Sequence, residues 1–201
     1  MKPNLETIIK ILSLKGDCKY TQESVTQLQH ALQCATLAEA CGASKELITA
    51  CLFHDIGHLV HNLGEDGGNR RFNNHHEYLS VKYLKHLFGK AITEPILLHV
   101  EAKRYLCAIK PDYFSTLSPA SQINLELQGG VFSPQTAAQF IHKPYAKEAV
   151  QLRMWDNQAK VIGKKTPDLK YFTKIVYQAM VISNIGNVLS SKFISATGVN
   201  H

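Results

Sequence analysis

The sequence predicts an all-α fold, a single bundle of short helices, on the basis of three observations. Apolar residues recur at helical spacing along most of the chain, and no stretch alternates polar and apolar residues for long enough to form a strand. The 201 residues are the size of one ordinary domain. Apolar residues make up 45% of them and charged residues 19%, which excludes disorder as the dominant state. We place this domain at residues 1–190 and expect 191–201 to form a frayed tail.

Each expected helix has a local start or stop signal. The first half of the chain holds helices at 2–15 (stopped by Gly16), at 25–41 (opened by an S-x-x-Q capping box of Ser24 and Gln27), from the cap Ser44 to about Gly57, and at 76–88. The second half holds helices at 95–107 with Pro95 in the first turn, two short ones opened by Ser118-Pro119 and Ser133-Pro134, one from Pro144 to about Ile162, and one over 168–189. The Gly- and Asn-rich segment 61–74 is longer than most connections, and such loops often cover functional sites.

Composition and motifs exclude several classes of protein. The five cysteines form no C-x-x-C pair, which argues against a disulfide framework or a thiolate zinc site. No segment is apolar over the ~18 residues of a membrane span, and the N-terminus lacks the apolar core of a signal peptide. We therefore expect a cytoplasmic protein with no membrane partner. No G-x-G-x-x-G motif marks a nicotinamide or flavin site.

The net charge of +6 favours anionic ligands in general. The basic segment at 164–170 lacks the interleaved aromatic residues of a nucleic-acid site, so we expect no nucleic acid partner. None of these features predicts an oligomeric state.

Histidine is unusually frequent, with ten residues, and some are placed for metal binding. Helical bundles build metal sites from side chains of several helices, and the six candidates come from five expected helices: His30, His54, Asp55, His76, His99 and Asp156. A single buried histidine is more often a packed core residue or a helix cap, and Asp156 alone could pair with Arg153 or Lys160. The adjacent His54-Asp55 favours a metal, because helix neighbours diverge by about 100° yet can bind one ion or bridge two.

The pattern His30…His54-Asp55…Asp156 resembles the HD-domain superfamily of metal-dependent enzymes, which implies that the helical domain is of the HD type. Four ligands of that kind hold one metal ion. The additional His76 and His99 resemble the dinuclear branch, which implies that Asp55 bridges two ions. The neighbouring His75 is a competing ligand, and His76 is chosen because His-Glu at the start of a helix matches the family pattern.

Longer segments resemble a smaller oxygenase branch of the superfamily. Leu98–Phe114, Leu117–Gly130 and Leu152–Lys160 are similar to the mixed-valent diiron oxygenases that cleave hydroxyphosphonates, which are related to myo-inositol oxygenase. The resemblance covers residues 20–160. It implies a centre of two Fe ions in a mixed Fe(II)/Fe(III) state.

Side chains near the predicted ligands independently favour an anionic substrate. Lys103, Arg153 and His58 lie three or four residues from predicted ligands and therefore on the same helix faces. Ser121 lies in the first turn of a capped helix, where backbone N–H groups favour an anion. A phosphonate, with three acceptor oxygens, suits these groups. The alternatives are that Lys103 is a solvated surface residue and that Arg153 only pairs with Asp156.

We expect Asp55, His58 and Lys103 to be catalytic, and Tyr20, Glu23, His58, Lys103, Ser121 and Arg153 to bind the substrate. The resemblance implies that Tyr20 and Glu23 form a latch over the metal, where a carboxylate suits a substrate amine. The alternative is that Tyr20 is a loop aromatic residue and Glu23 a charge at the start of a helix.

The expected activity is that of a diiron oxygenase which uses O2 to cleave the C–P bond of a small 1-hydroxyphosphonate. The resemblance implies (R)-2-amino-1-hydroxyethylphosphonate as the substrate, with glycine and phosphate as products. Two alternatives stay open. An HD-type phosphohydrolase acting on a nucleotide or phosphoester would work without O2, and a metal-binding regulatory module would show no turnover.

Overall fold

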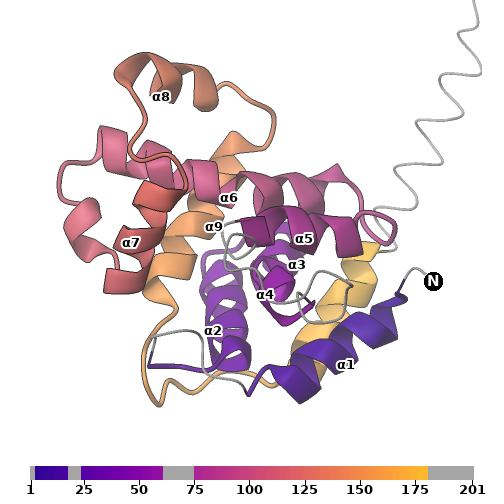
Figure 1. Ribbon diagram of the computed structural model, residues 1–201. Coiled ribbons are helices and arrows are strands. Elements are labelled where there is room, and N and C mark those ends of the chain that lie inside the picture. The colour runs from indigo at the N-terminus through magenta and orange to yellow at the C-terminus, as the bar shows by residue number, and fades with distance from the viewer. Residues whose placement is uncertain (1–2, 18–23, 61–74, 181–201) are drawn as a thin grey trace, which may run out of the picture.

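The computed structural model describes residues 3–17, 24–60 and 75–180. These residues form helices joined by turns and loops and contain no β-strand, as the sequence predicted. The helices, in the order seen in Figure 1, are α1 (Leu5–Lys15), α2 (Gln27–Ala40), α3 (Lys45–Phe53), α4 (Ile56–Val60), α5 (His76–Leu84), α6 (Lys90–Ile109), the 3-10 turn η3 (Phe114–Thr116), α7 (Pro119–Leu127), α8 (Pro134–Phe140), α9 (Ala146–Gln158) and a final helical segment over 169–180. Tyr20, Glu23, the segment 61–74, the end of the last expected helix and the tail 191–201 lie outside the described residues.

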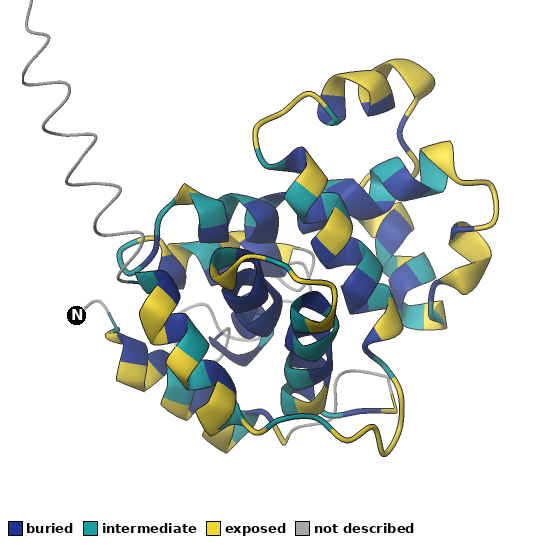
Figure 2. Ribbon diagram, turned by 180° about the vertical axis from the view of Figure 1, so that it is seen from behind, coloured by how far each residue is buried: buried dark blue, intermediate teal, exposed yellow. Residues whose placement is uncertain are grey.

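The long helices α6 and α9 pack against each other at the centre of the bundle. The largest apolar cluster joins them to α1, α2, α3, α4, α5 and the segment 169–180. The α1 helix and the segment 169–180 come from opposite ends of the described chain and lie side by side (Figure 1 and Figure 2). A second cluster joins α6 and α9 to α8, whose other residues are largely exposed (Figure 2). No described helix is long and apolar enough to cross a membrane.

Three of the four helix starts marked by a serine are confirmed. Ser44, Ser118 and Ser133 each accept a hydrogen bond from the backbone of the first turn, and proline occupies the first position of both α7 and α8. Gly129 and Gly130, between those two helices, have φ values of 97° and 67°, which favour glycine.

Other boundaries differ from the prediction. The capping box of α2 consists of Thr26 and Gln29, because the same signature recurs two residues after Ser24, and the helix begins at Gln27. Pro95 lies inside α6, whose N-cap is Gly89, so this helix is longer than the prediction with proline in the first turn. The α9 helix begins at Ala146, later than Pro144, because Tyr145 adopts a left-handed conformation with φ 62°.

The most consequential difference is a break where one continuous helix was expected. The α3 helix ends at Phe53, and the next begins at Ile56, so His54 and Asp55 lie in the turn between them. Ser80 of α5 stabilises this turn, because its hydroxyl donates to the carbonyl of His54 and accepts from the amide of Gly57. The turn therefore directs two adjacent side chains into the interior of the bundle.

Candidate metal centre

The six predicted ligands converge in the interior, and all of them are buried: His30 of α2, His54 and Asp55 of the turn, His76 of α5, His99 of α6 and Asp156 of α9. Their donor atoms form two groups, each within 4.8 Å, which are His30 with His54 and Asp55, and Asp55 with His76 and His99. Asp55 is common to both groups. The structure thus brings together all the residues that the sequence marked as ligands.

The two carboxylate oxygens of Asp55 face different histidines. Oδ2 lies 3.4 Å from Nε2 of His54 and 3.7 Å from Nε2 of His30. Oδ1 lies 3.2 Å from Nε2 of His76 and 3.8 Å from Nε2 of His99. This is the arrangement that a carboxylate bridging two metal ions requires.

Backbone carbonyls orient three of the four imidazoles. Nδ1 of His30 lies 2.9 Å from the carbonyl oxygen of Ala159, and Nδ1 of His54 lies 2.8 Å from that of Cys51. Nδ1 of His99 lies 2.6 Å from the carbonyl oxygen of Ile96. A carbonyl can only accept, so each Nδ1 carries the proton and each Nε2 presents a lone pair to the centre.

This donor set fits a pair of metal ions. Nε2 of His30 and Nε2 of His54 lie only 3.2 Å apart, and two facing lone pairs at that distance need a cation between them. Oδ1 of Asp156 is buried, has no hydrogen bond among the described residues and lies 3.4 Å from Nε2 of His30. Imidazole and carboxylate donors suit iron, manganese and similar divalent metals better than thiophilic ones.

Opposing effects set the charge of the buried carboxyls. Burial by itself raises the pKa of Asp55, but the surrounding histidines outweigh it and hold that pKa well below its usual value. Burial acts in the same direction on Asp156, where the nearby Arg153 guanidinium prevails and lowers the pKa. Both carboxyls are therefore ionised as metal ligands must be. Burial, followed by the charges of His76 and His54, lowers the pKa of His99 and keeps this ligand neutral.

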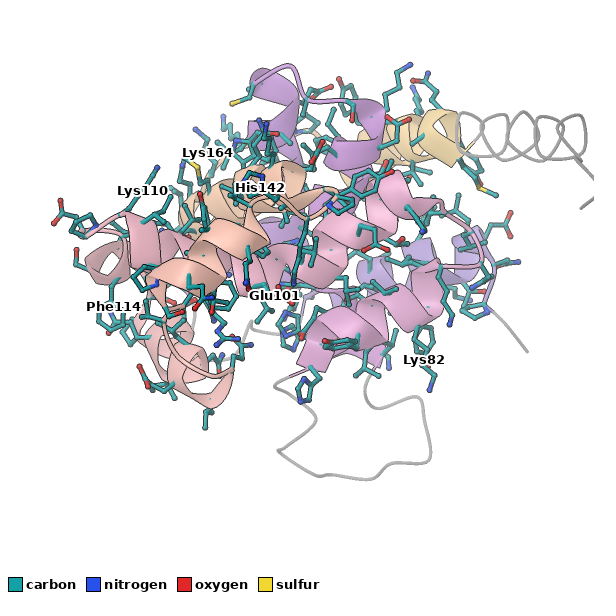
Figure 3. All side chains as sticks on the ribbon, turned by 90° about the horizontal axis from the view of Figure 1, so that it is seen from above. Lys82, Glu101, Lys110, Phe114, His142 and Lys164 are labelled. Atoms are coloured by element: carbon teal, nitrogen blue, oxygen red, sulfur yellow. The ribbon has the colours of Figure 1, made fainter. Side chains whose placement is uncertain are left out.

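Basic side chains lie beside this centre. Lys103 of α6 is only 3% exposed, and its ammonium lies 3.5 Å from the carbonyl oxygen of Ser121. Burial, together with the charge of Arg153, lowers the pKa of Lys103 to about 7. By contrast, Lys82 and Lys110 extend from the outer surface (Figure 3). The idea that Lys103 is a solvated lysine is therefore wrong.

Arg153 is buried and pairs with Asp156 one turn away on α9, so the structure supports the pairing that the sequence left open. This arginine holds a ligand in place and also adds positive charge beside Lys103.

Lys160 is a residue of this region that sequence reasoning considered only as a partner of Asp156. Its ammonium lies 3.4 Å from Oγ of Ser121 and 3.3 Å from Oγ of Ser118. The chain is held there by α2, because the amide of Gln33 donates to the carbonyl of Val161 and accepts from its N–H. Its position four residues after Asp156 was the available signal. Lys103, Arg153, Lys160 and Ser121 form what we call the basic cluster.

His58 lies beside the second group of ligands, which consists of Asp55, His76 and His99. Its ring stacks on His76 with centroids 4.2 Å apart, and Nε2 lies 4.0 Å from Oδ1 of Asp55. Its side chain is 18% exposed, more than those of the ligands around it. Of the neighbouring histidines, His75 is 66% exposed in its side chain whereas His76 faces the interior, in agreement with the choice of His76 as the ligand.

Comparison with known proteins identifies the family and several relatives of this chain. The HD-domain family matches residues 28–128. Over 178 residues the chain is 48% identical to a hydroxymethylphosphonate dioxygenase of Gimesia maris, covering 84% of this chain and 85% of the relative. Over 182 residues it is 38% identical to a [1-hydroxy-2-(trimethylamino)ethyl]phosphonate dioxygenase (glycine-betaine-forming) of Leisingera caerulea, covering 90% and 92%. An uncharacterized protein of Acanthamoeba polyphaga mimivirus is 35% identical over 179 residues.

The bundle and its buried His and Asp residues are thus those of a metal-dependent enzyme of the HD-domain class. Within that class, the chain belongs to the family of HD-domain hydroxyphosphonate oxygenases, as the resemblance in the sequence predicted.

Proposed function

We propose that this protein is a diiron dioxygenase that uses O2 to cleave the C–P bond of a small 1-hydroxyphosphonate. The observation that carries the proposal is the position of Asp55 between two histidine groups, next to the basic cluster. A dinuclear centre and a site for a compact anion are what such a reaction needs. The named relatives, both phosphonate dioxygenases, support the oxygenase over the phosphohydrolase and over a module without turnover.

The basic cluster binds the phosphonate in this proposal. Lys103 and Lys160 approach Ser121 from two sides, so an oxygen near this serine would receive charge-assisted hydrogen bonds from both ammonium groups. Arg153 adds a third positive charge while it holds Asp156. The three acceptor oxygens of a phosphonate match this set of donors better than a carboxylate does.

The metal ligands are His30, His54, Asp55 and Asp156 for one ion and Asp55, His76 and His99 for the other. Two iron ions held there, in the mixed Fe(II)/Fe(III) state of the proposal, would supply O2 activation and Lewis-acid orientation of the substrate. His58 is partly exposed and faces the Asp55 carboxylate, so it can exchange a proton between the centre and solvent. We assign the catalytic roles to Asp55, His58 and Lys103.

Two substrates are consistent with this reaction. The resemblance implies (R)-2-amino-1-hydroxyethylphosphonate, which with one O2 gives glycine and phosphate. The 48% identity to a hydroxymethylphosphonate dioxygenase favours hydroxymethylphosphonate as a second candidate, which by atom balance gives formate and phosphate. In both cases the substrate supplies all four electrons that O2 accepts, so the reaction needs no nicotinamide or flavin.

Tyr20 and Glu23 remain a proposed latch. If Glu23 meets an amine, Glu23→Gln weakens turnover of the aminated substrate much more than that of hydroxymethylphosphonate, because the amide keeps the shape and loses the charge. Equal losses on both substrates would contradict amine recognition by Glu23.

The experiment that tests the function measures O2 uptake and phosphate release together on iron-loaded protein. We expect one phosphate per O2 with a 1-hydroxyphosphonate and no phosphate without O2. Phosphate release from a phosphoester under anaerobic conditions would overturn the oxygenase in favour of the phosphohydrolase. His142→Ala, which removes an exposed histidine, is the matched control for losses in the ligand variants.

A further inference from the structure

His76 differs from the other three histidines of the centre in what its Nδ1 faces. The others face backbone carbonyl oxygens at 2.6 to 2.9 Å. Nδ1 of His76 instead lies 3.6 Å from Oε2 of Glu77. Both atoms are buried, and neither has a hydrogen-bond partner among the described residues. A small rotation of either side chain would therefore join a donor and an acceptor that have no other partner among the described residues.

Glu77 is a residue for which the proposed function has no role. It lies in the first turn of α5. A glutamate at such a position normally remains solvated and stabilises the helix by about 0.3–1 kcal/mol through its interaction with the helix dipole. Here the residue is only 4% exposed, and a buried carboxylate is unfavourable unless it is paired or hydrogen-bonded. Its other oxygen, Oε1, lies 3.8 Å from Nδ1 of His75. Its burial thus points to a partner in the interior rather than to a simple helix charge.

We infer that Glu77 is the positioning residue of the His76 ligand. Its carboxylate accepts the Nδ1 proton of His76, so that Nε2 keeps a lone pair directed at Oδ1 of Asp55 and at the metal position shared with His99. The inference rests on the metal centre of the proposed function. A carboxylate partner also makes an imidazole a stronger electron donor than a carbonyl partner does. The two metal positions are therefore inequivalent, because among the described histidine ligands His76 alone has a side-chain carboxylate facing its Nδ1.

The experiment titrates the metal-free protein with Fe(II) alone under anaerobic conditions and follows both binding equivalents. Glu77→Gln should weaken the second equivalent about ten- to hundredfold and leave the first unchanged, because its effect passes through His76. Glu77→Ala should weaken it further, since the glutamine carbonyl still accepts the Nδ1 proton and alanine offers no acceptor. Glu46→Gln is the matched control, because Glu46 occupies the same first-turn position in α3, at the end of that helix away from His54, and is partly exposed.

A second measurement reports the tautomer of His76 without turnover. In Zn(II)-loaded protein labelled with ¹⁵N-histidine, the Nδ1–H signal of His76 should move in Glu77→Gln while those of His30 and His54 stay in place. Unchanged Fe(II) affinity and an unchanged His76 signal in both Glu77 variants would overturn the inference. Equal losses in the Glu77 and Glu46 variants would also overturn it, in favour of a helix-dipole role.

Failure of the proposed function gives a different result. A wild-type protein that binds two Fe(II) ions but consumes no O2 with any hydroxyphosphonate would contradict the dioxygenase and leave the role of Glu77 intact. A wild-type protein that binds a single ion would overturn both.

Discussion

Oδ1 of Asp55 lies 3.2 Å from Nε2 of His76, at the point where α4 packs against α5. The close approach of these helices depends on Gly57, since a Cβ there would lie 2.0 Å from the carbonyl oxygen of His76. Asp55 thereby reaches the second histidine group while its other oxygen faces the first. Removal of the Asp55 side chain and removal of the His76 side chain should therefore have different effects on metal binding.

Asp55→Ala should lose both metal ions and all activity, because it removes the carboxylate that faces both groups. His76→Ala should lose one ion preferentially, since His30, His54 and Asp156 are unchanged. Metal analysis of the purified variants, with His142→Ala as the control, checks the difference. Two metal ions per chain and normal turnover in Asp55→Ala would contradict a bridging role for this residue.

Lys103→Ala and Lys160→Ala should each raise KM for the phosphonate about ten- to hundredfold, the effect of losing one charge-assisted contact. Metal content should stay near that of the wild type, because the hydrogen bonds of the two ammonium groups to described residues are to Ser118 and Ser121 and not to a metal ligand. Arg153→Ala should raise KM and also reduce metal content, since Asp156 loses the partner that holds it. Steady-state kinetics together with metal analysis separates these outcomes. An unchanged KM in both lysine variants would show that the phosphonate does not bind at the basic cluster.

The pH dependence of substrate binding should follow Lys103. Burial and the charge of Arg153 lower its pKa from 10.5 to about 7, while Asp156 and Cys107 oppose and Lys160 adds to the shift. The ammonium is charged below that value and neutral above it, so KM should rise above about pH 7. Lys103→Arg should abolish the rise, because a guanidinium stays protonated throughout.

The same shift has a consequence for stability. The unfolded chain binds a proton at Lys103 between pH 7 and 10.5 that the folded chain does not, so this residue makes the free energy of unfolding increase with pH in that window. Chemical denaturation of the wild type and of Lys103→Met across these pH values measures the effect. An identical pH dependence for the two proteins would show that Lys103 titrates normally.

Sequence reasoning succeeded where the signal is local. The serine caps of α3, α7 and α8 are set by a side chain and the amide three residues later, so they can be found without a tertiary structure. The ligands could be chosen because charged and imidazole groups in apolar surroundings need a partner. The same reasoning wrongly placed His54 and Asp55 on one continuous helix. The turn that holds them is stabilised by the hydroxyl of Ser80, which comes from a distant segment and therefore leaves no local signal in the sequence.

The role of Lys160 in the basic cluster also could not be predicted, because it depends on contacts between distant parts of the chain. Its position depends on the two hydrogen bonds between Gln33 and Val161, which join residues 128 positions apart. Helical spacing from Asp156 could not establish this, because α9 ends at Gln158 and the chain continues in an irregular path. The role of Glu77 was hidden for a similar reason, since a glutamate in a first turn is ordinarily exposed.

Gly57→Ala tests the packing of α4 on α5 directly. A methyl group would collide with the carbonyl oxygen of His76 and with Oγ of Ser80, at 2.0 and 2.9 Å from the added Cβ, so the two helices must separate. Overpacking of this kind lowers the free energy of unfolding by about 1–3 kcal/mol, against up to about 1 kcal/mol gained from the better helix propensity of alanine. The displacement of His76 should weaken the metal position at His76 and His99 more than the one at His30 and His54. Ser80→Ala, which removes the two hydrogen bonds without adding volume, is the comparison. Denaturation curves and Fe(II) titrations of both variants give the answer: if Gly57→Ala is as stable as the wild type and binds both ions equally well, the close approach of α4 and α5 does not position His76.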